Sequence, residues 1–119
     1  MIQPINTSSI KSWLEGFGLP VAREAFPVRD ENGVPNRVNV PFIVFSDRIG
    51  ADGSDLHNFY RTHSVTVELY TEDGDDSAFE AWLFAQDLKY SCDQNYVNQA
   101  QLYCSIFDIE DDFIEKEKH

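Results

Sequence analysis

Three histidines are the side chains in this sequence best suited to catalysis or metal binding. His57, His63 and His119 lie in an expected loop, at an expected strand start and at the C-terminus. None of them has a second histidine or a cysteine at the spacing of a zinc site. General-base catalysis also needs a partner that holds the imidazole in place, and the sequence points to none. We therefore interpret all three as structural residues.

Two acidic clusters could offer oxygen ligands to a hard cation. They occupy residues 52–55 and 73–76, with the sequences DGSD and DGDD. Neither has the order of oxygen ligands, glycine and final glutamate that an EF-hand loop requires. We interpret the first cluster as a solvated turn and the second as charges near a helix N-terminus, and we predict no metal and no cofactor.

The signatures of common enzyme classes are absent from the sequence. The chain has no Gly-x-Gly-x-x-Gly, no phosphate loop ending in Gly-Lys-Ser/Thr, no His-Glu-x-x-His and no Gly-x-Ser-x-Gly. Paired carboxylates for glycoside hydrolysis stay open, but nothing selects one pair among 21 acidic residues. We expect a protein that is not an enzyme.

Two apolar segments predict helices. The first has four large apolar side chains on one helical face, Ile10, Trp13, Leu14 and Phe17. Gly18 provides a stop directly after it. The second helix covers the apolar run 78–85, where Ser77 and Glu80 fit a Ser-x-x-Glu capping box.

Three segments between these helices predict strands. Residues 19–26 form a short edge strand, because prolines cannot donate to a neighbouring strand. Residues 41–45 are apolar on both faces, which predicts a strand inside the sheet. In residues 64–71, apolar and polar side chains alternate, so that one face of the strand is buried. The buried face consists of Val65, Val67 and Leu69.

Polar segments separate or follow these elements. Residues 29–39 are rich in turn-forming residues and predict a mobile loop, and residues 50–55 predict a polar loop. Residues 111–119 predict a charged, solvated C-terminal tail. The ordered core of the domain is thus expected to extend from about residue 8 to about residue 110.

The last two segments of the core predict a β-hairpin. Its strands cover residues 89–96 and 100–109, joined by a tight turn. Pairing of the strands across that turn sets Cys92 opposite Cys104, with both thiols pointing into the core. Cytosolic thiols stay reduced, so we expect two packed free cysteines and no disulfide.

Composition favours one small, acidic domain. The chain has 119 residues, of which 42% are hydrophobic, enough to build a single core and to argue against disorder. We predict an α+β fold in the order α-β-β-β-α-β-β. Its mixed or mainly antiparallel sheet has about five strands, and two helices pack on one face of the sheet.

The charge balance restricts the possible partners. Nine basic residues stand against 21 acidic ones, which gives a formal charge of −12. Such a surface repels a phosphate backbone and anionic membranes, so we expect neither sequence-specific nucleic-acid binding nor membrane binding. The N-terminus has no basic stretch followed by an apolar block, and we expect synthesis in the cytoplasm.

Five short segments resemble a known family when they are taken in order. They are residues 19–22 with Phe26, residues 41–45, residues 51–53, residues 67–71, and Tyr96 with residues 101–103. In this order and spacing the chain resembles the small tail-completion proteins of tailed-phage and prophage structural modules of Gram-positive bacteria. The likeness covers about residue 10 to about residue 110. The loop 29–39 is longer than this family suggests, and the tail 111–119 extends past its usual end.

The resemblance implies a structural role in the virion. It implies a tail terminator or tail-to-head joining protein that forms a ring on the tail tube and has no catalytic residues. Its partners would be other copies of itself, the tail tube protein and head-connector proteins. It would act in the host cytoplasm during assembly and then in the virion near the neck. Matching family segments contain Asp52, Gly53, Glu68 and Tyr70, which we take as candidate interaction residues. An acidic lumen in such a ring would let DNA pass without sticking.

Two other classes stay open at this point. The first is a small regulatory or ligand-binding α+β module whose sheet and helices enclose an apolar pocket. The second is a hydrolase in which two carboxylates converge in a cleft with perturbed pKa values. A deep pocket would favour the first, and converging carboxylates would favour the second.

Overall fold

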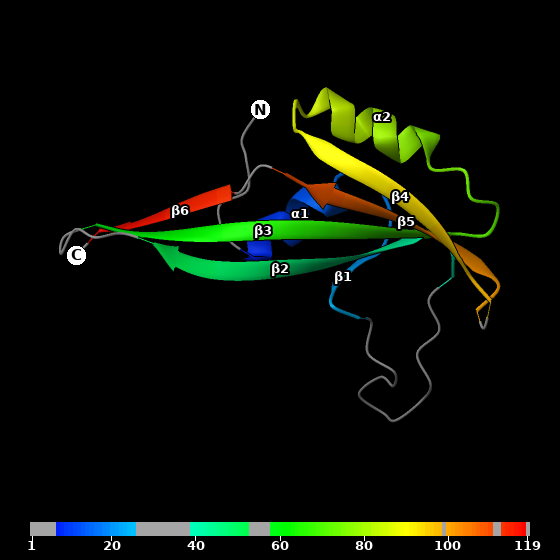
Figure 1. Cartoon of the computed structure of the whole chain (residues 1–119), viewed down its shortest axis with the longest axis horizontal. Coiled ribbons are helices and arrows are strands. Elements are labelled where there is room, and N and C mark those ends of the chain that lie inside the picture. Colours follow the sequence, from blue (N-terminus) through cyan, green and yellow to red (C-terminus); the bar gives the residue numbers. More distant parts are fainter. Residues whose placement is uncertain (1–6, 26–38, 53–57, 99, 111–112, 119) are drawn as a thin grey trace.

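A six-stranded mixed sheet and two helices make up the fold, which is α+β as predicted (Figure 1). The computed structural model describes residues 7–25, 39–52, 58–98, 100–110 and 113–118. The helices are α1 (Thr7–Glu15) and α2 (Ser77–Ala85). The strands are β1 (Val21–Arg23), β2 (Phe42–Asp52), β3 (Asn58–Thr71), β4 (Tyr90–Val97), β5 (Leu102–Ile109) and β6 (Phe113–Lys118).

The strand order is β1-β2-β3-β5-β4, and β6 also pairs with β3. Only the short β1 runs parallel to its neighbour, while all other pairs are antiparallel. The central strand, β3, confirms the predicted alternation, since Val65, Val67 and Leu69 are each at most 2% exposed. The predicted loop at residues 29–39 lies outside the described residues except for Asn39.

The hydrophobic core lies between this face of the sheet and the two helices. Ile10 and Leu14 of α1 and Phe79 and Leu83 of α2 all belong to one buried cluster with the apolar residues of β3. Aromatic rings also join α2 to α1 and to the segment that follows α1. Those contacts are Trp13 with Trp82 at 5.3 Å between ring centroids and Phe17 with Phe79 at 5.0 Å. Large aromatic contacts therefore fix both helices over the sheet.

The structure agrees with only part of what the sequence predicts about the helix ends. Gly18 has a φ of 104°, the left-handed conformation that favours glycine after a helix, as predicted. The predicted capping box at α2 is wrong, because the N-cap is Asp76 and makes no side-chain hydrogen bond there. Instead the amide and the hydroxyl of Ser77 donate to Asp75 Oδ1, at 3.1 and 2.6 Å. A carboxylate one residue before the cap takes over the role expected of Ser77.

A long arm extends from the sheet, formed by the ends of β2 and β3 together with β6 (Figure 1). Gly50 belongs to β2 and pairs with Thr62 of β3, so the prediction of a loop starting there is wrong. The prediction of a solvated C-terminal tail is also wrong. Phe113 is 1% exposed, packs 5.7 Å from the ring of Trp13, and begins β6. This one buried aromatic ties the C-terminal segment to the core.

β5 and β6 follow one another along the same edge of β3, because β2 occupies the other edge. Thr66 pairs with Asp108, and His63, three residues earlier, pairs with Phe113, five residues later. The segment from Asp108 to Phe113 is therefore two residues longer than the segment of β3 from His63 to Thr66. Because this difference in length is an even number of residues, the alternation of side chains between the two faces is preserved, and Phe113 lies on the core face.

The β4–β5 hairpin exists as predicted, but its register differs. Val97 pairs with Leu102, which makes the connection longer than the predicted turn. Cys92 consequently pairs with Phe107 and not with Cys104. A shift by an odd number of residues reverses the face of every side chain. The prediction of two opposed thiols in the core is wrong, because Cys92 is exposed and only Cys104 is buried.

Candidate functional site

The structure describes three of the four predicted interaction residues, and they lie in two separate places. Glu68 and Tyr70 lie on the face of β3 that points away from the buried core residues. Asp52 is the last residue of β2 and pairs in register with Tyr60 in the arm. Gly53 lies outside the described residues. The structure thus brings Glu68 and Tyr70 together and places Asp52 at the far end of the long hairpin.

Around Tyr70 the outer sheet face carries a small aromatic and polar group. The Tyr70 ring stacks on Phe42 at 5.0 Å, and the thiol of Cys104 donates to Glu68 Oε2 at 3.8 Å. Burial, reinforced by Cys104 and Glu68, raises the pKa of the Tyr70 hydroxyl, and burial is also the main cause that raises the pKa of the Cys104 thiol. Both groups stay protonated at neutral pH. The thiol therefore lacks the thiolate character that a nucleophile requires.

β4 is the last strand of the sheet, and no described strand pairs with its outer edge. Six of its eight residues are exposed, and only its two end residues are partly covered. It carries neither lysine nor proline, and its single charged residue is Asp93. Proteins commonly block such edges with lysine, proline or a bulge, because the unpaired backbone groups otherwise accept another strand. β4 is therefore the most open pairing surface among the described strands.

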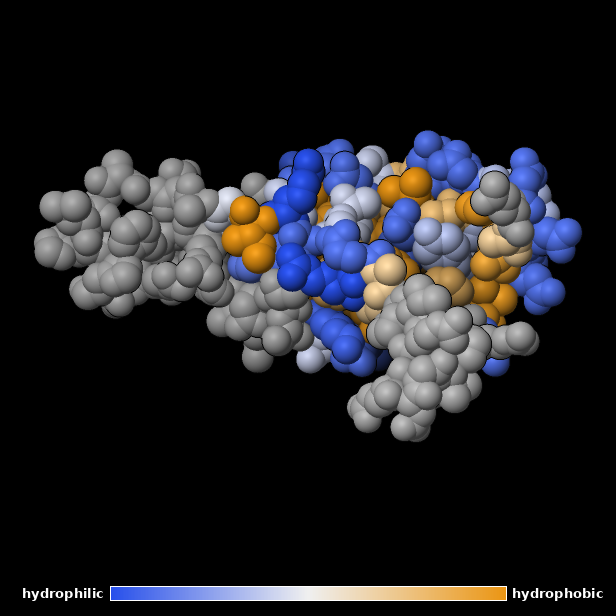
Figure 2. Space-filling view, turned by 90° about the horizontal axis from the view of Figure 1, so that it is seen from below, coloured by the Kyte–Doolittle hydropathy of each residue, from blue (hydrophilic) through white to orange (hydrophobic). Residues whose placement is uncertain are grey.

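A second open edge lies on the opposite side of the same sheet. β1 pairs only with Ile43 to Phe45, and no described strand pairs with the outer edge of β2 from Arg48 to Asp52. One carbonyl of this edge, that of Asp47, accepts a hydrogen bond from Arg23 Nη2 at 3.2 Å. Further along, Ile49 is 49% exposed. In the view of Figure 2 the hydrophobic surface is broken into small patches among hydrophilic ones.

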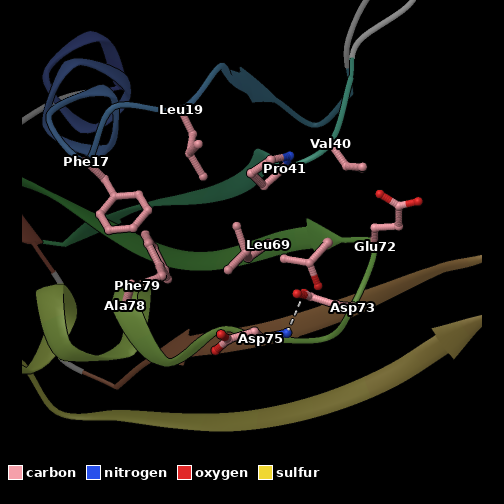
Figure 3. A pocket seen from close by; sticks show the side chains of 11 residues that line it. Phe17, Leu19, Val40, Pro41, Leu69, Glu72, Asp73, Asp75, Ala78 and Phe79 are labelled. Carbon is pink, nitrogen blue, oxygen red and sulfur yellow. Dashed lines mark hydrogen bonds between the residues drawn. The ribbon is translucent and has the colours of Figure 1, made fainter.

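A cavity of about 440 Å³ opens beside the start of α2 (Figure 3). Leu69, Thr71 and Phe79 form its buried floor. Exposed carboxylates line one side, among them Glu72 and Asp73. Among the described residues that line the cavity, none is basic. The cavity has the size of a small ligand site and combines an apolar floor with negative charge.

One buried ionisable pair escaped the sequence analysis. His63 Nδ1 lies 2.9 and 3.1 Å from the two carboxylate oxygens of Asp47, and the residues are 2% and 4% exposed. The alternation of buried residues along the two strands could have predicted this pair. Asp47 lies two residues after Phe45, and His63 lies two residues before Val65. Extending both strands by one step places both side chains on the buried face.

The Asp47–His63 pair has the geometry of a base and its orienting carboxylate. His63 Nε2, the atom that would take a proton from a nucleophile, is buried and has no hydrogen-bond partner within the described chain. A buried atom offers no access to a substrate from solution. This arrangement joins β2 to β3 and keeps Nε2 of His63 out of contact with solvent.

Other site types receive no support from the described residues. They contain no group of three or more histidine, cysteine or acidic side chains that could hold a metal ion. No helix in the described ranges has the length and apolar character needed to cross a membrane. No protein family, curated protein or solved structure matches the chain. Its function must therefore be argued from its own edges, faces and cavity.

Proposed function

We propose that this chain is a non-enzymatic assembly protein whose copies join through their sheet edges into a ring. One observation carries this proposal: among the described strands, two unlike edges of one sheet have no pairing strand, that of β4 on one side and that of the end of β2 on the other. A strand edge binds another edge through backbone hydrogen bonds, with little demand on side chains. The sheets of successive copies can therefore continue into one another.

Unlike edges determine the symmetry of such an assembly. When two different surfaces of one chain pair head to tail, the product is a closed ring or an open helical filament. Pairing of β4 with a second β4 would instead give a two-fold dimer and leave the other edges free. The outer edge of β2 from Arg48 onward, with which no described strand pairs, supplies the second, unlike surface that a ring needs.

The resemblance to phage tail-completion proteins suggests where in the virion the proposed ring acts. In that role the ring would end the tail tube or join the tail to the head, in the host cytoplasm first and then in the virion. The outer sheet face with Tyr70 stacked on Phe42 offers a flat contact for a tube or connector protein. The formal charge of −12 is consistent with a lumen through which DNA passes.

Lysine substitutions in β4 test the edge contact. Ser91 and Asn95 are exposed and share one face of β4. Ser91→Lys with Asn95→Lys therefore adds two positive charges that oppose the pairing of this edge with another strand. We expect the wild-type mass in native mass spectrometry or sedimentation to rise with protein concentration. The double variant should remain monomeric at concentrations at which the wild-type chain assembles.

A matched control variant distinguishes a specific effect at the β4 edge from the general effect of added positive charge. Ser12→Lys with Ala81→Lys adds the same charge at exposed positions in the helices and none in β4. Added lysines reduce the net repulsion between acidic chains, so this control should assemble at least as well as the wild-type protein. Equal assembly of the β4 variant and the control would contradict the proposal, as would a wild-type chain that stops at a dimer.

A further inference from the structure

The cavity beside α2 is an open cleft whose floor consists of buried residues. Leu69, Thr71 and Phe79 are each at most 5% exposed and form the floor, while Phe17 and Leu19 form a half-buried apolar wall. In Figure 3 these apolar side chains converge from β3, α2 and the segment after α1. A large apolar side chain placed there would lose its contact with water on several sides.

Negative charge lines the opposite side of the cleft. Asp73 Oδ1 accepts a hydrogen bond from the amide of Asp75 at 3.0 Å, a contact drawn in Figure 3. Hydrogen bonds from the hydroxyl and the amide of Ser77 lower the pKa of Asp75, which therefore stays ionised at neutral pH. With Glu72 exposed beside them, three carboxylates face any group that enters. This side of the cleft favours a cation.

We propose that the cleft is a docking site for a segment of a partner protein that inserts one large apolar side chain and carries an arginine or lysine next to it. The apolar floor accepts the first group, and the carboxylates accept the second. Five of the lining residues are exposed, so the cleft covers an anchored side chain from below but does not enclose a whole small molecule. This proposal does not depend on the sheet edges.

A pair of dipeptides tests the predicted chemistry. N-acetyl-Trp-Arg-amide and N-acetyl-Trp-Glu-amide share the apolar group and differ in charge, and either can be titrated into the ¹⁵N-labelled full chain. The arginine peptide should shift the amide signals of Leu69, Thr71 and Ala78 saturably, with a Kd on the order of 1 mM for so small a probe. The glutamate peptide should bind at least about tenfold more weakly, because it replaces attraction by repulsion at exposed carboxylates.

Two alanines of α2 supply a matched pair of variants. Ala78 lines the cleft, whereas Ala81 is exposed on the same helix and does not line it. Ala78→Phe should fill the cleft and abolish saturable binding, while Ala81→Phe should leave the Kd unchanged. Glu72→Gln with Asp73→Asn should weaken the arginine peptide by about fivefold, the loss typical of two exposed ion pairs. Asn at position 73 keeps an oxygen that can accept the amide of Asp75.

Three outcomes would overturn the proposal. The first is the absence of saturable shifts at the cleft with the arginine peptide. The second is equal binding by the Ala78→Phe and Ala81→Phe variants, which would place the contact elsewhere. The third is tighter binding of free tryptamine than of the arginine peptide by more than about tenfold, which would identify a small-amine site and not a protein-docking site.

Discussion

His63 Nδ1 lies 2.9 Å from Asp47 Oδ2, and this contact joins two strands where the helices end and the arm begins. Both residues are almost wholly buried, so neither can recover its hydrogen bonds from water if the other is removed. The pair therefore fixes the register of β2 against β3 at the point from which the arm extends. The open edge of β2 depends on that register.

Removing one member of the pair should destabilise the fold. Asp47→Leu leaves His63 buried without its carboxylate, and we expect the free energy of unfolding to fall by about 3 kcal/mol. Urea unfolding followed by tryptophan fluorescence measures this loss. The double variant Asp47→Leu with His63→Leu should be more stable than the single variant, because it does not leave the imidazole of His63 buried without its carboxylate. A double variant less stable than Asp47→Leu would contradict this account.

Two phenylalanines test the role of the C-terminal strand. Phe113 is 1% exposed and Phe84 is 77% exposed, so the same substitution has different consequences. Phe113→Ala should lower the free energy of unfolding by about 3 kcal/mol through loss of core contacts and a residual cavity. Phe84→Ala should change it by less than about 0.5 kcal/mol. Equal effects of the two substitutions would mean that β6 is not anchored through Phe113.

The two cysteines should differ in accessibility. Cys92 is exposed and Cys104 is buried on the other face of the sheet, so titration with a thiol reagent should detect one thiol in the native protein and two in urea. Partial desolvation and nearby carboxylates raise the pKa of the Cys92 thiol, which lowers its thiolate fraction at a given pH. Its reaction should therefore be slower than that of free cysteine and should accelerate as the pH rises. An intramolecular disulfide under mild oxidation would contradict the observed register.

Periodicity made the core of the fold predictable. The alternation around Val67 specifies one buried face of β3, and the spacing of Ile10 and Leu14 specifies the buried face of α1. Both follow from local geometry, because side chains repeat every two residues in a strand and about every 3.6 in a helix. The α+β class follows from the order of these elements.

Register and strand length were not predictable in the same way. The pairing of Cys92 depends on the number of residues in the turn, which the sequence does not fix, and an odd error reverses every face. The sequence indicates a structural residue at a strand start for His63 and no role for Asp47, and only the structure shows that their side chains meet in the core. Phe113 stands in a charged segment, and only its contact with Trp13 shows that this segment belongs to the sheet.

The two open edges determine whether copies of this chain can form a ring, and a cysteine pair measures their contact directly. Ile49 lies on the same sheet face as Cys92, whereas Arg48 lies on the other face, and Cys92 is the only exposed cysteine among the described residues. After oxidation of the concentrated protein, Ile49→Cys should give a ladder of disulfide-linked multimers joined through positions 49 and 92, and Arg48→Cys should not. Dimers linked only through Cys92 to Cys92, or no linked species from Ile49→Cys, would contradict the head-to-tail ring.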